Sequence, residues 1–173
     1  MVHEFTLKYQ VGLASEGGLD ALIERLGEAG CDDALVGSGQ PGRLALAFSR
    51  EAADAAEAMR SALRDARQAM PEATLIEAGP DLVGLTETAD LMGMSRQNMR
   101  KLMLANDDFP APVHGGGTAL WHLADLLHWL AGRGYAVPAP HLAVARVTMQ
   151  VNIAKEALRL SATLTRTVQG WLG

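Results

Sequence analysis

The sequence predicts an α+β protein in three parts, and three patterns along its 173 residues predict it. Residues 1–79 alternate between strand-like and helix-like spacing of apolar side chains. Residues 85–104 have the spacing of two helices that are joined by a tight turn. From His141 to Gln169 neither glycine nor proline interrupts the chain, which favours a long helix.

The order of the expected elements predicts the fold of residues 1–79. Residues 5–9 alternate as a strand, and residues 19–29 have helical spacing. The elements expected after them are a short strand at 34–36, a strand at 43–48, a helix from Arg50 to about Met70 with Ser49 as its N-cap, and a strand at 74–77. The order β-α-β-β-α-β is that of a ferredoxin-like sandwich, in which two helices cover an antiparallel sheet. We expect this domain to dimerise or to bind an effector or a protein partner, because the fold does not choose among these roles.

Residues 37–42, GSGQPG, match the dinucleotide-binding pattern G-x-G-x-x-G letter for letter. That pattern binds a pyrophosphate only where a helix N-terminus follows the glycines. Here the strand-like segment RLALAF follows, and a proline lies inside the turn. We therefore interpret residues 37–42 as a hairpin turn and expect no bound cofactor.

The second domain is expected at residues 82–134, after the glycine and proline of the segment 78–81. Ala89 allows two helices to approach, Gly93 forms the turn, and Met99 and Leu102 fill the angle between the helices. Ser95 is the expected N-cap of the second helix. The exposed side chains of this helix are of the types that reach base edges or phosphates in DNA. These side chains are Arg96, Gln97, Asn98, Arg100 and Lys101.

Two further elements complete the second domain. Residues 109–121 form two short extended pieces around the glycines at 115–117, which predicts a β-hairpin, or wing. The spacing in residues 122–130 predicts a third helix. The side chains expected to face the core are Leu123, Leu126, Leu127 and Leu130. We assign Trp121 and Trp129 to packing behind the second helix.

Residues 83–132 resemble the excisionase-like and MerR-like winged helix-turn-helix family. The resemblance rests on LTETADLMGMSRQNMRKL, on FPAP at 109–112, on the glycine turn, and on Trp121 with the ending ADLLHWL. It implies a reader of double-stranded DNA, whose second helix enters the major groove and whose wing lies on the minor groove or the backbone. It implies major-groove contacts from Arg96, Gln97 and Arg100, and wing contacts from His114 and Thr118. The chain departs from the family in its acidic segment 106–108 and in a wing without arginine or lysine.

The C-terminal helix, residues 141–172, is apolar on more than one side and would be about 45 Å long if unbroken, at ~1.5 Å per residue. One stripe contains Leu142, Met149, Ile153, Leu160, Leu164 and Trp171, and another contains Val144, Val147, Val151 and Leu158. Such a helix has to be covered twice. We expect it to dimerise, and the alternative is that it packs over the N-terminal domain of its own chain.

Charge and composition bound the function. Residues 1–80 contain seven basic and thirteen acidic residues, whereas residues 81–173 contain eight and seven, so the acidic half is not expected to touch DNA. The five histidines lack a metal-ligand spacing, and the single Cys31 excludes an internal disulfide, so neither a metal nor an enzyme is expected. No segment reads as a signal peptide or a membrane span, which makes the cytoplasm the expected location.

The sequence thus predicts a sequence-specific DNA-binding protein, of the kind that regulates transcription in bacteria and acts as a homodimer. Two alternatives stay open. One is a protein-interaction adaptor, antitoxin-like or phage-derived, whose second domain contacts protein. The other is an architectural factor of the excisionase type, which bends DNA without regulating a promoter.

Overall fold

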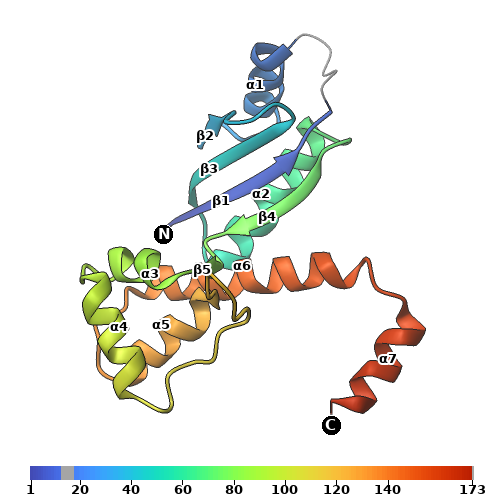
Figure 1. The fold of residues 1–173 in the computed structure, drawn as a ribbon. Coiled ribbons are helices and arrows are strands. Elements are labelled where there is room, and N and C mark those ends of the chain that lie inside the picture. Colours follow the sequence, from blue (N-terminus) through green and yellow to red (C-terminus); the bar gives the residue numbers. More distant parts are fainter. Residues whose placement is uncertain (13–17, 173) are drawn as a thin grey trace.

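The computed structural model describes residues 1–12 and 18–172 of a mixed α/β protein with a small antiparallel sheet. Figure 1 shows a sheet-containing domain at the top, a smaller helical domain below it, and helix α6 running between the two. The α+β class expected from the sequence is confirmed.

The N-terminal domain has the expected element order β-α-β-β-α-β. Its elements are β1 (Val2–Gln10), α1 (Gly18–Glu28), β2 (Ala34–Gly37), β3 (Arg43–Glu51), α2 (Ala55–Ala69) and β4 (Thr74–Gly79). The strands are arranged in the order β2-β3-β1-β4, and every neighbouring pair is antiparallel. Alternate residues of β1 and β3 are buried and pack against α1 and α2, so both helices cover one face of the sheet.

The segment 37–42 is a hairpin turn, as expected. It joins β2 to β3, which pair antiparallel from Gly37 with Ala45 to Ala34 with Phe48. Gly42 has a φ of 74°, a backbone conformation that other residues rarely adopt.

The expected cap of the second helix was wrong. Strand β3 continues through Ser49 to Glu51, and α2 begins at Ala55 with Asp54 as its N-cap. The Asp54 carboxylate accepts a hydrogen bond from the Glu57 backbone N–H at 2.8 Å. Arg50 keeps the strand going, because its side chain is buried and paired with the carboxylates of Asp33 and Asp65.

The second domain consists of three short helices and two short strands, and the longer helix α6 that follows them packs against both domains. Its elements are β5 (Leu82–Val83), α3 (Leu85–Leu91), α4 (Arg96–Ala105), β6 (Trp121–His122) and α5 (Leu123–Gly132). Strand β5 pairs antiparallel with β6, which ties the start of the domain to the start of α5. Leu123, Leu126, Leu127 and Leu130 are all buried, so the core side expected for the third helix is confirmed.

Helix α6 (Ala139–Ala157) belongs to both hydrophobic cores. Val144, Val147 and Val151 pack in the core of the N-terminal domain, whereas Leu142, Ala145 and Met149 pack in that of the second domain. Up to Asn152, the two apolar stripes of this helix are therefore covered within the same chain, by one domain each, whereas Ile153 is 53% exposed. For residues 139–152 the alternative of packing within the chain is the observed one.

Polar contacts fix α6 along the free edge of β4. The Asn152 side chain accepts a hydrogen bond from the Ala78 backbone N–H and donates one to the Ala78 carbonyl, both at 2.8 Å. It also donates to the carboxylate of Asp81, which is 2% exposed and lies 2.6 Å from Nδ1 of His122. The Thr148 hydroxyl donates to the Pro80 carbonyl. Asn152 thus occupies the place of a neighbouring strand, and Asp81 links three segments of the chain.

The C-terminal helix is not continuous, in contrast to the expectation. Helix α6 ends at Ala157, and α7 (Ala162–Trp171) begins after the N-cap Ser161. Beyond Lys155 the helix has passed the edge of β4. Neither hydrophobic core packs against the chain there to keep the helix continuous. Ser161 then starts a new helix by accepting a hydrogen bond from the Leu164 backbone N–H. None of the helices in the described ranges is long and apolar enough to cross a membrane.

Candidate nucleic-acid interface

A tight turn positions α4 against α3. Gly93 has a φ of 63° in this turn, and the Met94 backbone N–H donates to the Ala89 carbonyl at 2.9 Å. Ala89 and Met99 are both fully buried, so the small residue and the apolar plug lie where the spacing predicted them. Leu102 is half-buried in the same core. The consequence is a short helix pair whose relative placement is set by packed side chains.

The N-terminus of α4 is capped and therefore well defined. The Ser95 hydroxyl accepts a hydrogen bond from the Asn98 backbone N–H at 3.1 Å, as the N-cap prediction requires. The hydrogen of the Ser95 hydroxyl stays available to donate to another acceptor. The backbone N–H groups of Arg96 and Gln97 lie in the first turn, where a helix has no carbonyl to offer them. This end of α4 thus presents donors to solvent, an arrangement that suits a phosphate.

The exposed face of α4 is positively charged. Arg96, Gln97, Asn98, Arg100 and Lys101 are all exposed, as expected from the sequence. Within residues 1–12 and 18–172, none of the three basic side chains forms an ion pair. Arg96 and Arg100 are one turn apart, as are Gln97 and Lys101, so the charges project in neighbouring directions from a short helix.

The acidic segment that follows α4 is partly neutralised. Asp108 is ion-paired with Arg133, which also donates a hydrogen bond to the side chain of Asn106. The Arg133 guanidinium holds the pKa of Asp108 below its usual range. Arg133 itself lies over the ring of Trp129, 4.7 Å from its centroid. Asp107 is exposed and forms no ion pair in the described part of the chain.

The other acidic neighbours are on α3. The Glu87 carboxylate accepts a hydrogen bond from the Gly84 backbone N–H and so caps its own helix. Asp90 is exposed near the turn. The charge around α4 is therefore mixed at its margins, with Asp90 at one end and Asp107 at the other.

The predicted wing is a minimal hairpin. One bridge joins His114 to Leu120, and the backbone N–H of each of the two residues donates to the carbonyl of the other. His114 and Thr118 are exposed, but the His114 ring folds back over the loop, where a Cβ on Gly116 would lie 2.8 Å from its Nε2. No arginine or lysine occurs in this loop. The groups that the wing presents to a ligand are thus the Thr118 hydroxyl, the loop backbone and the His114 ring, which already contacts its own loop.

The two tryptophans pack behind this unit, as expected. Trp121 is 4% exposed, and its Nε1 donates to the Pro110 carbonyl at 2.9 Å. Phe109 contacts both indoles edge-on, with centroid distances of 6.2 Å to Trp121 and 5.0 Å to Trp129. This aromatic cluster holds the base of the hairpin against α5.

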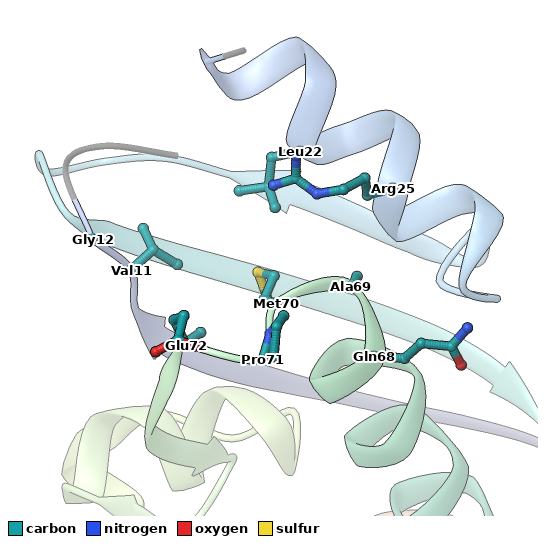
Figure 2. A pocket seen from close by; sticks show the side chains of 10 residues that line it. Val11, Gly12, Leu22, Arg25, Gln68, Ala69, Met70, Pro71 and Glu72 are labelled. Carbon is teal, nitrogen blue, oxygen red and sulfur yellow. The ribbon is translucent and has the colours of Figure 1, made fainter. Parts of the chain in front are cut away.

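The N-terminal domain contains a cleft of about 490 Å³ that is remote from α4 in the sequence. Figure 2 shows Val11, Leu22 and Met70 around its middle and the Arg25 guanidinium close to Leu22. The helical spacing of residues 19–29 in the sequence gave no sign of a cleft. Such a volume is in the range of small-molecule sites.

Two observations concern metal ligands and the single cysteine. No group of three His, Cys, Asp or Glu side chains in the described ranges is arranged to hold a metal ion. Cys31 is buried, and burial raises the pKa of its thiol to about 11, which keeps it protonated near neutral pH.

Comparison with known proteins adds no assignment: no family model, no curated protein and no solved structure matches this chain.

Proposed function

We propose that the protein binds double-stranded DNA in a sequence-specific manner through α4. The observation that carries the proposal is a set of exposed amide side chains and of cationic side chains without an ion pair in the described part of the chain, on a helix whose start is capped and whose buried face is packed. A binding site needs side chains that are available to a ligand, on a backbone that keeps its position when the ligand binds.

In this proposal, α4 enters the major groove with its first turn leading. Arg96, Gln97 and Arg100 contact base edges, for which arginine prefers guanine and glutamine prefers adenine. Lys101, Asn98 and the Ser95 hydroxyl contact phosphates, together with the N–H groups of the first turn. His114 and Thr118 stay the proposed wing contacts, with the backbone of the loop beside them.

The finer fold assignments are part of the same proposal. The strand order β2-β3-β1-β4 with two helices on one face supports a ferredoxin-like sandwich. The paired α3 and α4, the hairpin at 113–120 and the returning helix α5 match the order of a winged helix-turn-helix. With the resemblance to excisionase-like and MerR-like proteins, we propose a transcriptional regulator of the bacterial type, whose N-terminal cleft accepts a small effector.

Selection of bound sequences from a randomised duplex pool tests the proposal directly. The full chain is expected to enrich a motif, and its affinity is expected to fall as salt rises because phosphates are contacted. Arg96→Ala is expected to cost about 1–3 kcal/mol on the selected site and to relax the motif at one position. Arg67→Ala, an exposed arginine on α2, is the matched control and should leave both unchanged.

The rival proposal is a protein-interaction adaptor, and three observations favour it. The wing lacks basic residues, Asp90 and Asp107 are exposed beside α4, and the net charge is −5. Absence of enrichment, with no binding to any duplex at low salt, would replace the DNA reader by the adaptor. Binding that bends DNA without a preferred promoter site would identify an architectural factor.

A further inference from the structure

The chain after α6 exposes large apolar side chains that neither core uses. The exposed fractions are 88% for Leu158, 60% for Leu160, 58% for Leu164, 72% for Trp171 and 83% for Leu172. Helix α7 has no buried residue. Figure 1 shows it hanging from the end of α6, away from both domains. Tryptophan and leucine at such exposure are unusual unless a partner covers them.

A helix as short as α7 is not stable by itself in water. It has ten residues, whereas isolated helices below about 12–15 residues are marginal even in favourable sequences. Its N-cap at Ser161 contributes only about 1 kcal/mol. Packing of its apolar side is therefore the condition for α7 to exist as a helix.

Two leucines, one in α7 and one at its C-cap, are spaced evenly about Val168. Leu164, Val168 and Leu172 follow at intervals of four, and Trp171 lies beside Leu172. In an antiparallel pair centred on Val168, each Leu164 would face the Leu172 of the other copy. A self-complementary patch of this kind is what a two-fold interface requires.

The charge of the segment also favours an identical partner. Between residues 160 and 172 the only charged side chain is Arg166, which stands two residues from Val168 and so projects from the opposite side of the helix. Two copies would therefore pair without bringing like charges together, while a charged partner would find no complement on this side.

We propose that the apolar stripe of Leu164, Val168, Trp171 and Leu172 pairs antiparallel with the same stripe of a second copy. Covering one leucine removes about 60–120 Å² from water, on the basis of 1.5–3 kcal/mol at 25 cal/mol per Å². Four such side chains bury roughly 240–480 Å² per copy, which is below the ~800 Å² per partner of a stable interface and in the range of weak, transient ones. The dimer should accordingly dissociate on dilution, and it does not depend on DNA binding.

Sedimentation equilibrium of the full chain over a wide concentration range tests the dimer. Leu164→Asp is expected to raise the dissociation constant about 100-fold or more, because each substitution is repeated across the two-fold axis. Leu35→Asp is the matched control, since Leu35 is a 78% exposed leucine on β2 and its substitution should leave the constant unchanged. A monomer at every concentration, or a dimer that is lost in Leu35→Asp and kept in Leu164→Asp, would overturn the proposal.

Cysteine crosslinking tests the register. Val168→Cys places a thiol at the proposed two-fold axis, and mild oxidation is expected to join two chains by a disulfide. Arg166→Cys places the thiol on the other side of the same helix and should crosslink far less. The native Cys31 is buried and should not compete. Equal crosslinking of the two variants, or none in Val168→Cys where a dimer sediments, would contradict the proposed pairing.

Discussion

Arg50 of the N-terminal domain and the arginines of α4 in the second domain are held in opposite ways. Arg50 on β3 is 7% exposed, and its guanidinium donates to the carboxylates of Asp33 and Asp65, to the Ser61 hydroxyl and to the Gly30 carbonyl. Arg96 and Arg100 on α4 are exposed and have no ion-pair partner in the described part of the chain. The difference teaches that an arginine whose donors are satisfied internally supports the fold, whereas one held unsatisfied on a rigid helix is available to a ligand.

Removal of Arg50 should have the largest effect on stability. Arg50→Ala removes the buried cation beside Asp65, a residue only 6% exposed, and leaves its carboxylate with the exposed Arg64 alone, while Asp33 loses its partner. Breaking a buried pair in this way costs about 3–5 kcal/mol in the free energy of unfolding. Urea unfolding followed by circular dichroism measures it. Arg67→Ala should change the midpoint very little, and a loss for Arg50→Ala as small as that of the control would show that the network is not structural.

The pH dependence of stability sharpens the same contrast, because Cys31 lies beside this network. Burial raises the pKa of the thiol from 9.0 to about 11, and this outweighs the opposing effect of Arg50. The folded state thus prefers the protonated thiol. The protonated thiol therefore adds to the free energy of unfolding. This contribution is complete below pH 9, and about 2–3 kcal/mol of it is lost as the pH rises from 9 to 11.

Comparison of the wild-type chain with Cys31→Ala isolates this contribution, since the other groups that titrate in that range are the same in both. Unfolding free energies are measured at pH 8 and at pH 11. The wild type is expected to lose more stability between the two than the variant does. Equal losses would mean that the thiol ionises in the folded state as it does in water.

Ser95→Ala tests the support of the exposed arginines. Loss of the N-cap costs about 1 kcal/mol of stability. Because the start of α4 is then less defined, affinity for the selected duplex should fall as well, although no base contact is removed. Thermal unfolding and duplex titration on the same preparation measure the two effects. Ser95→Asp restores the cap acceptor and should recover stability, but not the affinity, since it adds a negative charge facing phosphate.

The smallest effect is expected at the wing. His114→Ala removes a ring that contacts its own loop, so stability should change by less than about 0.5 kcal/mol. Affinity for the duplex should change less than in Arg96→Ala. A larger loss of affinity in His114→Ala would move the main contact from α4 to the wing.

Local patterns predicted much of this structure. The alternation of β1 and β3, the helical spacing of α1 and α5, and the Ser95 cap all depend on neighbours within a few residues. The spacing of Ala89, Gly93 and Met99 likewise encodes a local turn, so the position of α4 could be expected.

The failures have long-range causes. Ser49 is a good cap locally, but Arg50 finds its partners 17 residues before it and 15 after it, and these keep the chain extended. The break after α6 follows from the place where the sheet edge ends, which no local residue signals. The Asp81 network joins residues 41 and 71 positions apart, beyond the reach of any periodicity. The face of α4 could be predicted as exposed, but not the Arg133 that neutralises Asp108.

The contact between Asn152 and Ala78 has a consequence for the order of synthesis. The two residues are 74 positions apart, so the sheet leaves the ribosome well before the helix that covers its edge. Until then, the outer strand keeps a free backbone donor and acceptor, and the places of Val144, Val147 and Val151 stay open to water. During this interval the hydrophobic core of the nascent N-terminal domain is therefore incomplete. Packing of α6 completes that core in the same step that attaches the second domain.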